Sequence, residues 1–67
     1  MMKVIFFDKR RSTYASVENV VEIRSEWSRD KGHLCRIWLV VPEDGFTKAF
    51  KQRYYEIERI ELQGGTR

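Results

Sequence analysis

The chain is 67 residues long, and 42% of these residues are apolar, including two Trp, three Tyr and four Phe. A chain of this length forms a single domain and buries only about 60% of its extended surface, which leaves little room for a catalytic cleft beside the core. The apolar content excludes a disordered chain. The net charge of +3 sets thirteen Lys and Arg against ten Asp and Glu, so long-range attraction of a charged partner is weak.

Cysteine usage and the first residues predict the compartment. Cys35 is the only cysteine, so no disulfide within the chain can stabilise the fold, which is typical of a reducing environment. The opening run MMKVIFF carries one Lys before four apolar residues, too few for a signal peptide and far short of the ~20 residues that span a membrane. We therefore expect a cytoplasmic protein without membrane contact.

In chain order, the first predicted element is a β-hairpin. Residues 3–7 are β-branched and aromatic, a cationic turn follows at 8–12, and residues 13–15 lead onward to the next strand. Three consecutive cations, Lys9, Arg10 and Arg11, lie in this turn. They either bind an anion or are solvated charges that keep the protein soluble and prevent pairing between strand edges.

The next two elements form a central hairpin, because apolar residues alternate with polar ones along both. Residues 17–27 alternate from Val17 to Trp27, and residues 33–41 alternate in the same way. A polar loop at 28–32 separates the two runs. The predicted core of this hairpin consists of Val21, Ile23, Cys35, Ile37 and Leu39.

The opposite face of residues 33–41 is more apolar than a solvated face needs to be. It combines aromatic, aliphatic and guanidinium side chains, which are typical anchors of interfaces. The residues of this candidate interface are Leu34, Arg36, Trp38 and Val40. We expect this face to close inside a barrel, to pair two copies as a homodimer, or to bind another protein.

Pro42 ends the strand, since proline has no N–H to donate to a ladder.

The last third of the chain is open to two interpretations. The dipeptide Asp44-Gly45 predicts a hairpin turn, which returns residues 46–50 antiparallel and lets residues 55–62 close the sheet. Residues 46–62 also fit a helical period, which would pack a C-terminal helix on the sheet. The order of their charges opposes the helix dipole by up to ~0.3–1 kcal/mol per residue and favours strands.

The predicted fold class is therefore all-β, as a five-stranded antiparallel meander or a small SH3-like barrel. The alternative is an α+β fold with the C-terminal helix. One domain covers residues 1–63, and residues 64–67 are expected to form a flexible tail.

The order of elements resembles a class of small proteins. It combines the segment VENV entering a strand, a Trp-bearing strand, an Asp-Gly turn and the closing segment YEIERIEL. In this order the chain resembles the small β-meander proteins encoded by bacterial phages and mobile elements. The resemblance implies a five-stranded sheet or SH3-like barrel that acts by binding, as an accessory factor, without catalytic residues. The basic first turn departs from the usual Asp-Gly or Asn-Gly, so the resemblance does not identify a partner.

No constellation of residues predicts catalysis, a cofactor or a metal site. His33 is the only histidine and lacks the second ligand pair that a zinc site requires. Cys35 lies on an apolar strand face, where a thiol behaves as a small hydrophobe. The four Gly residues do not form a phosphate-binding loop. We therefore expect a binding protein that is not an enzyme and has no cofactor.

Two binding functions follow from the sequence. The first is protein interaction or self-assembly through the candidate interface. The alternative is binding of DNA or RNA by basic loops, in which cations contact phosphates and aromatic rings stack on bases. The candidate residues for this alternative are Lys9, Arg10, Arg11, Arg29, Lys31, Lys48, Lys51, Arg53 and Tyr54. The candidate stacking residues are Tyr14, Trp27, Tyr54 and Tyr55.

Overall fold

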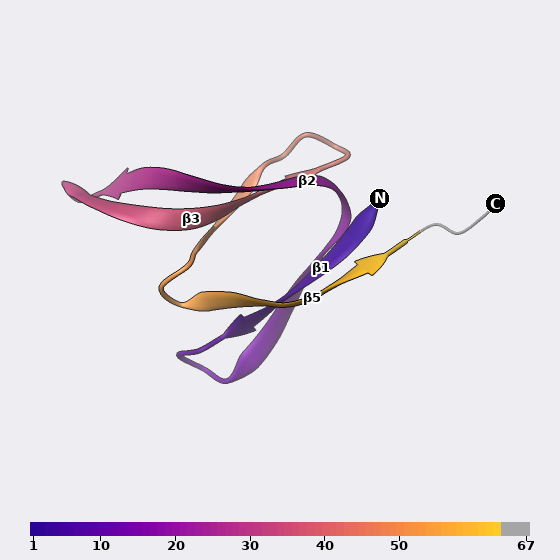
Figure 1. Cartoon of the computed structure of the whole chain (residues 1–67), viewed down its shortest axis with the longest axis horizontal. Helices are drawn as coiled ribbons and strands as arrows, with labels where there is room; N and C mark the ends of the chain where they lie inside the picture. The colour runs from indigo at the N-terminus through magenta and orange to yellow at the C-terminus, as the bar shows by residue number, and fades with distance from the viewer. Residues whose placement is uncertain (64–67) are drawn as a thin grey trace.

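Five antiparallel strands form one open sheet in the computed structural model, which describes residues 1–63 (Figure 1). The strands are β1 (Met2–Asp8), β2 (Thr13–Asp30), β3 (His33–Pro42), β4 (Lys48–Lys51) and β5 (Tyr55–Leu62). Their order in the sheet is β4-β3-β2-β1-β5. The prediction of an all-β five-stranded meander is confirmed, and the alternative of a C-terminal helix is wrong. The tail predicted at 64–67 lies outside the described residues.

The sheet curls so that its two ends approach each other. Phe50 of β4 stacks on Phe6 of β1 with ring centroids 4.3 Å apart, although β3 and β2 separate these strands in the sheet order. Within residues 1–63, no ladder joins β4 to β5, so the sheet does not close into a complete barrel. No helix in the same part of the chain is long and apolar enough to cross a membrane.

The core lies on the concave side of this curl. Its fully or nearly fully buried members are Val4, Phe6, Val17, Val20 and Val40. Partly buried side chains surround them: Met2, Ile23, Trp38, Phe50, Tyr55 and Ile57. Burial of each large apolar side chain contributes about 1.5–3 kcal/mol to folding, so a few residues supply most of the stability of so small a domain.

The predicted core of the central hairpin is largely wrong, because the structure turns the other face of β3 inward. Ile23 does pack against the core, but its partner across the hairpin is Val40. Cys35, Ile37 and Leu39 are only half-buried and lie on the opposite face. The cause is the turn: only Lys31 and Gly32 separate the strands, with φ angles of 52° and 84°. A two-residue turn pairs odd positions of β2 with even positions of β3.

A second departure lies in β2, which is one long bent strand of 18 residues. Its register with β1 shifts at Asn19, which has a φ of 58°, and its register with β3 shifts at Val21. These bulges explain why Val17 and Val20 are both buried while Val21 is 52% exposed, contrary to the predicted alternation. The Asn19 backbone is hydrogen-bonded on both sides, since its N–H donates to Gln63 Oε1 (2.7 Å) and its carbonyl accepts from the Glu43 N–H (2.8 Å).

The molecule is flat and elongated, with extents of 46 × 26 × 14 Å. Its radius of gyration is 12.7 Å, larger than the about 11 Å typical of a compact domain of this length. The β2–β3 hairpin accounts for the excess because it extends beyond the rest of the sheet (Figure 1). Three turns, β1–β2, β2–β3 and β4–β5, lie toward one end, and the β3–β4 turn, the N-terminus and the end of β5 lie toward the other.

Candidate anion-binding site

The end of the molecule that carries three turns is strongly cationic. The segments 8–12, 29–33 and 51–54 hold seven of the thirteen Lys and Arg but only two of the ten carboxylates. We call this surface the basic end and define it by its cations: Lys9, Arg10, Arg11, Arg29, Lys31, Lys51 and Arg53. The two carboxylates, Asp8 and Asp30, are each engaged by a cation of the same surface.

The β1–β2 turn is held in one conformation by Asp8 and by the β4–β5 turn. The Asp8 carboxylate accepts a hydrogen bond from the Arg10 N–H at 2.9 Å, and the Asp8 carbonyl accepts one from the Ser12 N–H at 2.8 Å. The Lys9 N–H donates to the carbonyl of Tyr54 at 2.8 Å. The cationic turn is therefore docked on the β4–β5 turn.

Arg10 is the side chain that joins these two turns. Its Nε lies 3.5 Å from Asp8 Oδ1, and its guanidinium lies over the Tyr54 ring, 4.1 Å from the centroid. Arg53 approaches the same ring at 5.6 Å. Such cation–π contacts stabilise by about 0.5–1 kcal/mol at exposed sites. Arg10 is therefore part of the fold and not a free charge at a turn tip.

Lys9 and Arg11 are exposed, as Arg10 is, but unlike Arg10 neither forms an ion pair within residues 1–63. Their positive charges face solvent on either side of an anchored residue. Of the three consecutive cations, these two are available to an anion.

Asp8 is 4% exposed, and its surroundings shift the pKa of its carboxyl group. Burial alone would raise its pKa, but hydrogen bonds from the Arg10 and Arg11 backbone and the positive charge of Arg10 outweigh burial and lower the pKa below its ordinary value of 3.8. A carboxylate whose pKa is lower in the folded state stabilises the fold above its unfolded pKa. That stabilisation is lost as the pH falls through the folded pKa.

We therefore expect the free energy of unfolding to fall below about pH 4, and expect Asp8→Asn to remove part of this fall while lowering stability at pH 7. Urea denaturation followed by tryptophan fluorescence across a pH series measures both effects. The matched control is Asp44→Asn, because the exposed Asp44 also accepts a backbone hydrogen bond two residues on, from Phe46 at 2.9 Å. An equal change in the acid profile of both variants would contradict the role given to Asp8.

The β2–β3 and β4–β5 turns enclose a shallow groove of about 220 Å³ at the basic end. Lys31, His33, Lys51, Arg53 and Tyr54 contribute to its walls. A hydrogen bond and ion pair with Asp30 raise the pKa of Lys51, which keeps this amine protonated. Among residues 1–63, no group of three His, Cys, Asp or Glu side chains could hold a metal ion.

Most of the residues predicted to bind nucleic acid come together at the basic end. Lys48 does not, because it lies opposite Val40 at the start of β4, three residues before the β4–β5 turn region begins at Lys51. Arg29 donates from Nη1 to the Gly32 carbonyl at 3.2 Å and so lies along its own turn. Tyr54 is half-buried with guanidinium groups on its ring, which makes it a support for cations and not a free stacking surface.

The two most apolar members of the candidate protein interface on β3 lie inside the fold. Val40 is fully buried, and Trp38 packs against the core and donates from Nε1 to the Tyr55 carbonyl at 3.3 Å. Leu34 and Arg36 are exposed because they lie beyond the core, near the tip of the hairpin. The face is apolar because it is the inside of the sheet.

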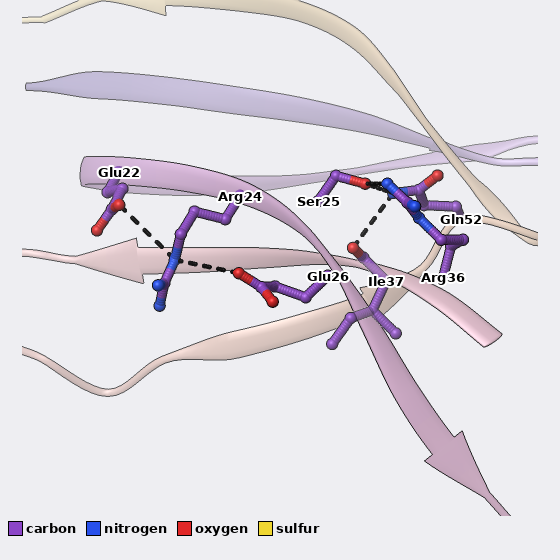
Figure 2. A network of polar contacts seen from close by, with 7 residues as sticks. All are labelled: Glu22, Arg24, Ser25, Glu26, Arg36, Ile37 and Gln52. Carbon is purple, nitrogen blue, oxygen red and sulfur yellow. Dashed lines mark hydrogen bonds and ion pairs between the residues drawn. The ribbon is translucent and has the colours of Figure 1, made fainter. Parts of the chain in front are cut away.

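Sequence reasoning missed a polar cluster of Ser25, Arg36 and Gln52 at the margin of the core (Figure 2). The Gln52 amide donates to Ser25 Oγ at 2.7 Å and to the Ile37 carbonyl at 3.2 Å, and Arg36 also donates to Ser25 Oγ. On the other face of β2, Arg24 lies between Glu22 and Glu26 at 3.6 and 3.8 Å. No periodic pattern relates residue 25 to residue 52, so only the fold reveals the cluster.

No family model, curated protein or solved structure matches the chain. The chemistry of its own surface is therefore the basis for a functional proposal. The basic end presents several ammonium and guanidinium groups, and hydrogen bonds hold the backbone of its β1–β2 and β4–β5 turns. This arrangement is suited to contacts with several phosphates of one polyanion.

Proposed function

We propose that the chain binds nucleic acid through the basic end, with cations of the three turns contacting phosphates. The observation that best supports this proposal is that the β4–β5 turn contacts both the β1–β2 turn and the β2–β3 turn. These three turns carry seven Lys and Arg in a chain of net charge +3. The rest of the described surface carries most of the acids. A polyanion is therefore attracted to one end and oriented by it.

The two carboxylates at the basic end do little to oppose such binding. Asp8 is buried beneath Arg10, and Asp30 is paired with Lys51. Lys9, Arg11 and Lys31 are exposed and come from two different turns. Phosphates spaced along a backbone match cations that are spaced in this way better than a single small anion does.

Protein interaction through β3 has less support than the sequence suggested, because the apolar face that motivated it lies inside the fold. Of its four candidate residues, only Leu34 and Arg36 are exposed. Nucleic-acid binding is therefore the function that we favour.

The test is the salt dependence of binding to a labelled single-stranded oligonucleotide, measured by fluorescence anisotropy. We expect affinity to fall with rising NaCl at a log-log slope of about −0.7 for each contacted phosphate. The double variant Lys9→Gln/Lys31→Asn should flatten this slope by up to about 1.4. Asn is chosen at position 31 because the residue there has a φ of 52°, which Asn tolerates.

The matched control is Lys3→Gln/Lys48→Gln, which removes the same net charge from β1 and β4, outside the segments that define the basic end. It should change the slope little. Binding that does not depend on salt, or an equal flattening of the log-log salt slope in both double variants, would contradict the proposal. Unchanged denaturation curves establish that neither variant perturbs the fold.

A further inference from the structure

We infer that the nucleic acid bound at the basic end is single-stranded and that Trp27 stacks on one of its unpaired bases. This inference rests on the proposed function and adds the class of ligand to it. Its basis is the position of Trp27, an exposed aromatic ring held by a guanidinium next to the cationic turns.

Trp27 lies on the concave face of the β2–β3 hairpin, beyond the edge of the core. Along this face the cross-strand pairs run from Ile23 with Val40, through Ser25 with Trp38, to Trp27 with Arg36. The first pairs belong to the core, whereas Trp27 is 62% exposed. A large apolar ring with this exposure at the margin of a core is suited to contact with a partner.

One part of the Trp27 ring surface is already occupied. The guanidinium of Arg36 lies over the ring at 4.7 Å from its centroid, and Arg36 is itself held by Ser25. The Gln52 side chain donates to the same Ser25 hydroxyl at 2.7 Å, and the Gln52 N–H donates to the Arg36 carbonyl at 3.0 Å. The ring is therefore supported from one side by a fixed cation, which lowers the entropy cost of stacking a base on the exposed remainder.

The register of the hairpin places Trp27 beside Arg29, a cation of the basic end, because the pair of Trp27 with Arg36 and the pair of Arg29 with Leu34 follow one another on the same face. Gln52 is followed by Arg53 and Tyr54, and Tyr54 carries the Arg10 guanidinium on its ring. A strand whose phosphates contact the turns can therefore present a base to the concave face of the hairpin. Duplex nucleic acid cannot do so without unstacking, because its bases are already stacked on one another.

The other aromatic candidates are less suited to this role. Tyr55 packs edge-on against Phe6 and Phe50 in the core. Tyr14 is 64% exposed, but its ring leans on Phe7 at 5.2 Å, and its pairing with Phe7 places it on the convex face of the sheet. Tyr54 is covered by Arg10 and Arg53.

The experiment compares a single-stranded DNA oligonucleotide with a duplex of the same sequence, at equal phosphate concentration and low salt. Tryptophan emission reports stacking directly, because Trp27 is exposed whereas Trp38 is packed against the core. We expect the single strand to bind more tightly and to quench the emission, and the duplex to bind without quenching. Trp27→Leu should weaken single-strand binding by about 5- to 150-fold and leave duplex binding unchanged.

Two further variants keep the test independent of folding. Trp27→Phe retains a smaller ring and should recover part of the single-strand affinity, and Trp38 emission reports whether each variant is folded. Phe46→Ala is the matched control, since Phe46 is 76% exposed in the β3–β4 turn, away from the basic end. It should bind both probes like the parent chain.

Equal affinity for single strand and duplex without quenching would overturn the inference while leaving salt-dependent nucleic-acid binding intact. Loss of single-strand binding in Tyr14→Ala but not in Trp27→Leu would also overturn it, by moving the contact to the convex face. Absence of salt-dependent binding to either probe would instead refute the proposed function.

Discussion

Replacing Phe6 by Ala should lower the free energy of unfolding by about 3–5 kcal/mol, which is enough to unfold most of the population of so small a domain. Phe6 is fully buried, stacks on Phe50 at 4.3 Å and meets Tyr55 edge-on at 6.3 Å. Its ring thus holds β4 against β1 and packs on the start of β5, which the ladder already pairs with β1. Far-ultraviolet circular dichroism and urea denaturation measure the loss.

Phe46→Ala removes the same side chain from an exposed site and should change stability by no more than about 0.5 kcal/mol. Similar losses at the two positions would mean that the stacked pair does not hold the sheet in its curl. A loss below about 1 kcal/mol for Phe6→Ala would lead to the same conclusion.

Trp38→Glu should unfold the chain and not simply disrupt an interface. The indole packs against the core, lies beside Phe50 across the β3–β4 ladder and donates to the Tyr55 carbonyl at 3.3 Å. Loss of the ring costs about 3–5 kcal/mol, and a carboxylate left against apolar neighbours adds a desolvation cost. Thermal denaturation and size-exclusion chromatography distinguish an unfolded chain from a folded monomer.

Trp27→Glu supplies the matched control, because it makes the same chemical change two cross-strand pairs farther along the hairpin, where the side chain is 62% exposed. This variant should stay folded, since the new carboxylate faces solvent and lies near Arg36. A folded Trp38→Glu monomer that replaces a parental dimer would show that the apolar face of β3 serves assembly after all.

The strand content of this fold was predictable because period-two alternation is a local signal. The boundaries near β3 were also close, since Pro42 and Gly45 mark its end and the following turn by their backbone chemistry. The face that each strand turns toward the core was harder to predict from the sequence. It depends on whether the loop after Asp30 has an even or odd number of residues, and a polar run from 28 to 32 does not reveal where pairing stops.

The candidate site was predicted as a set of residues but not as a place. Clusters of Lys and Arg can be read along the chain, whereas their convergence depends on the β4–β5 turn docking beside the β1–β2 turn. The sequence partly indicates that Arg10 is anchored, because Asp at the start of a turn often accepts hydrogen bonds from the residues that follow. Nothing in the sequence indicates that Arg36 lies over the Trp27 ring, because this contact depends on the register of the β2–β3 hairpin.

The pairing of β1 with β5 also bears on how the chain reaches its native state. Met2 lies opposite Leu62, so β1 gains its second neighbour only after nearly the whole described chain has been brought together. Closing so long a loop costs entropy before the contact is made, and such non-local topologies fold in milliseconds to seconds, compared with microseconds to milliseconds for helical bundles. During synthesis, Val4 and Phe6 therefore remain without their final cover until Tyr55 and Ile57 have left the ribosome. The β1–β2 hairpin can form early, but it acquires a dry core only when the last strand docks.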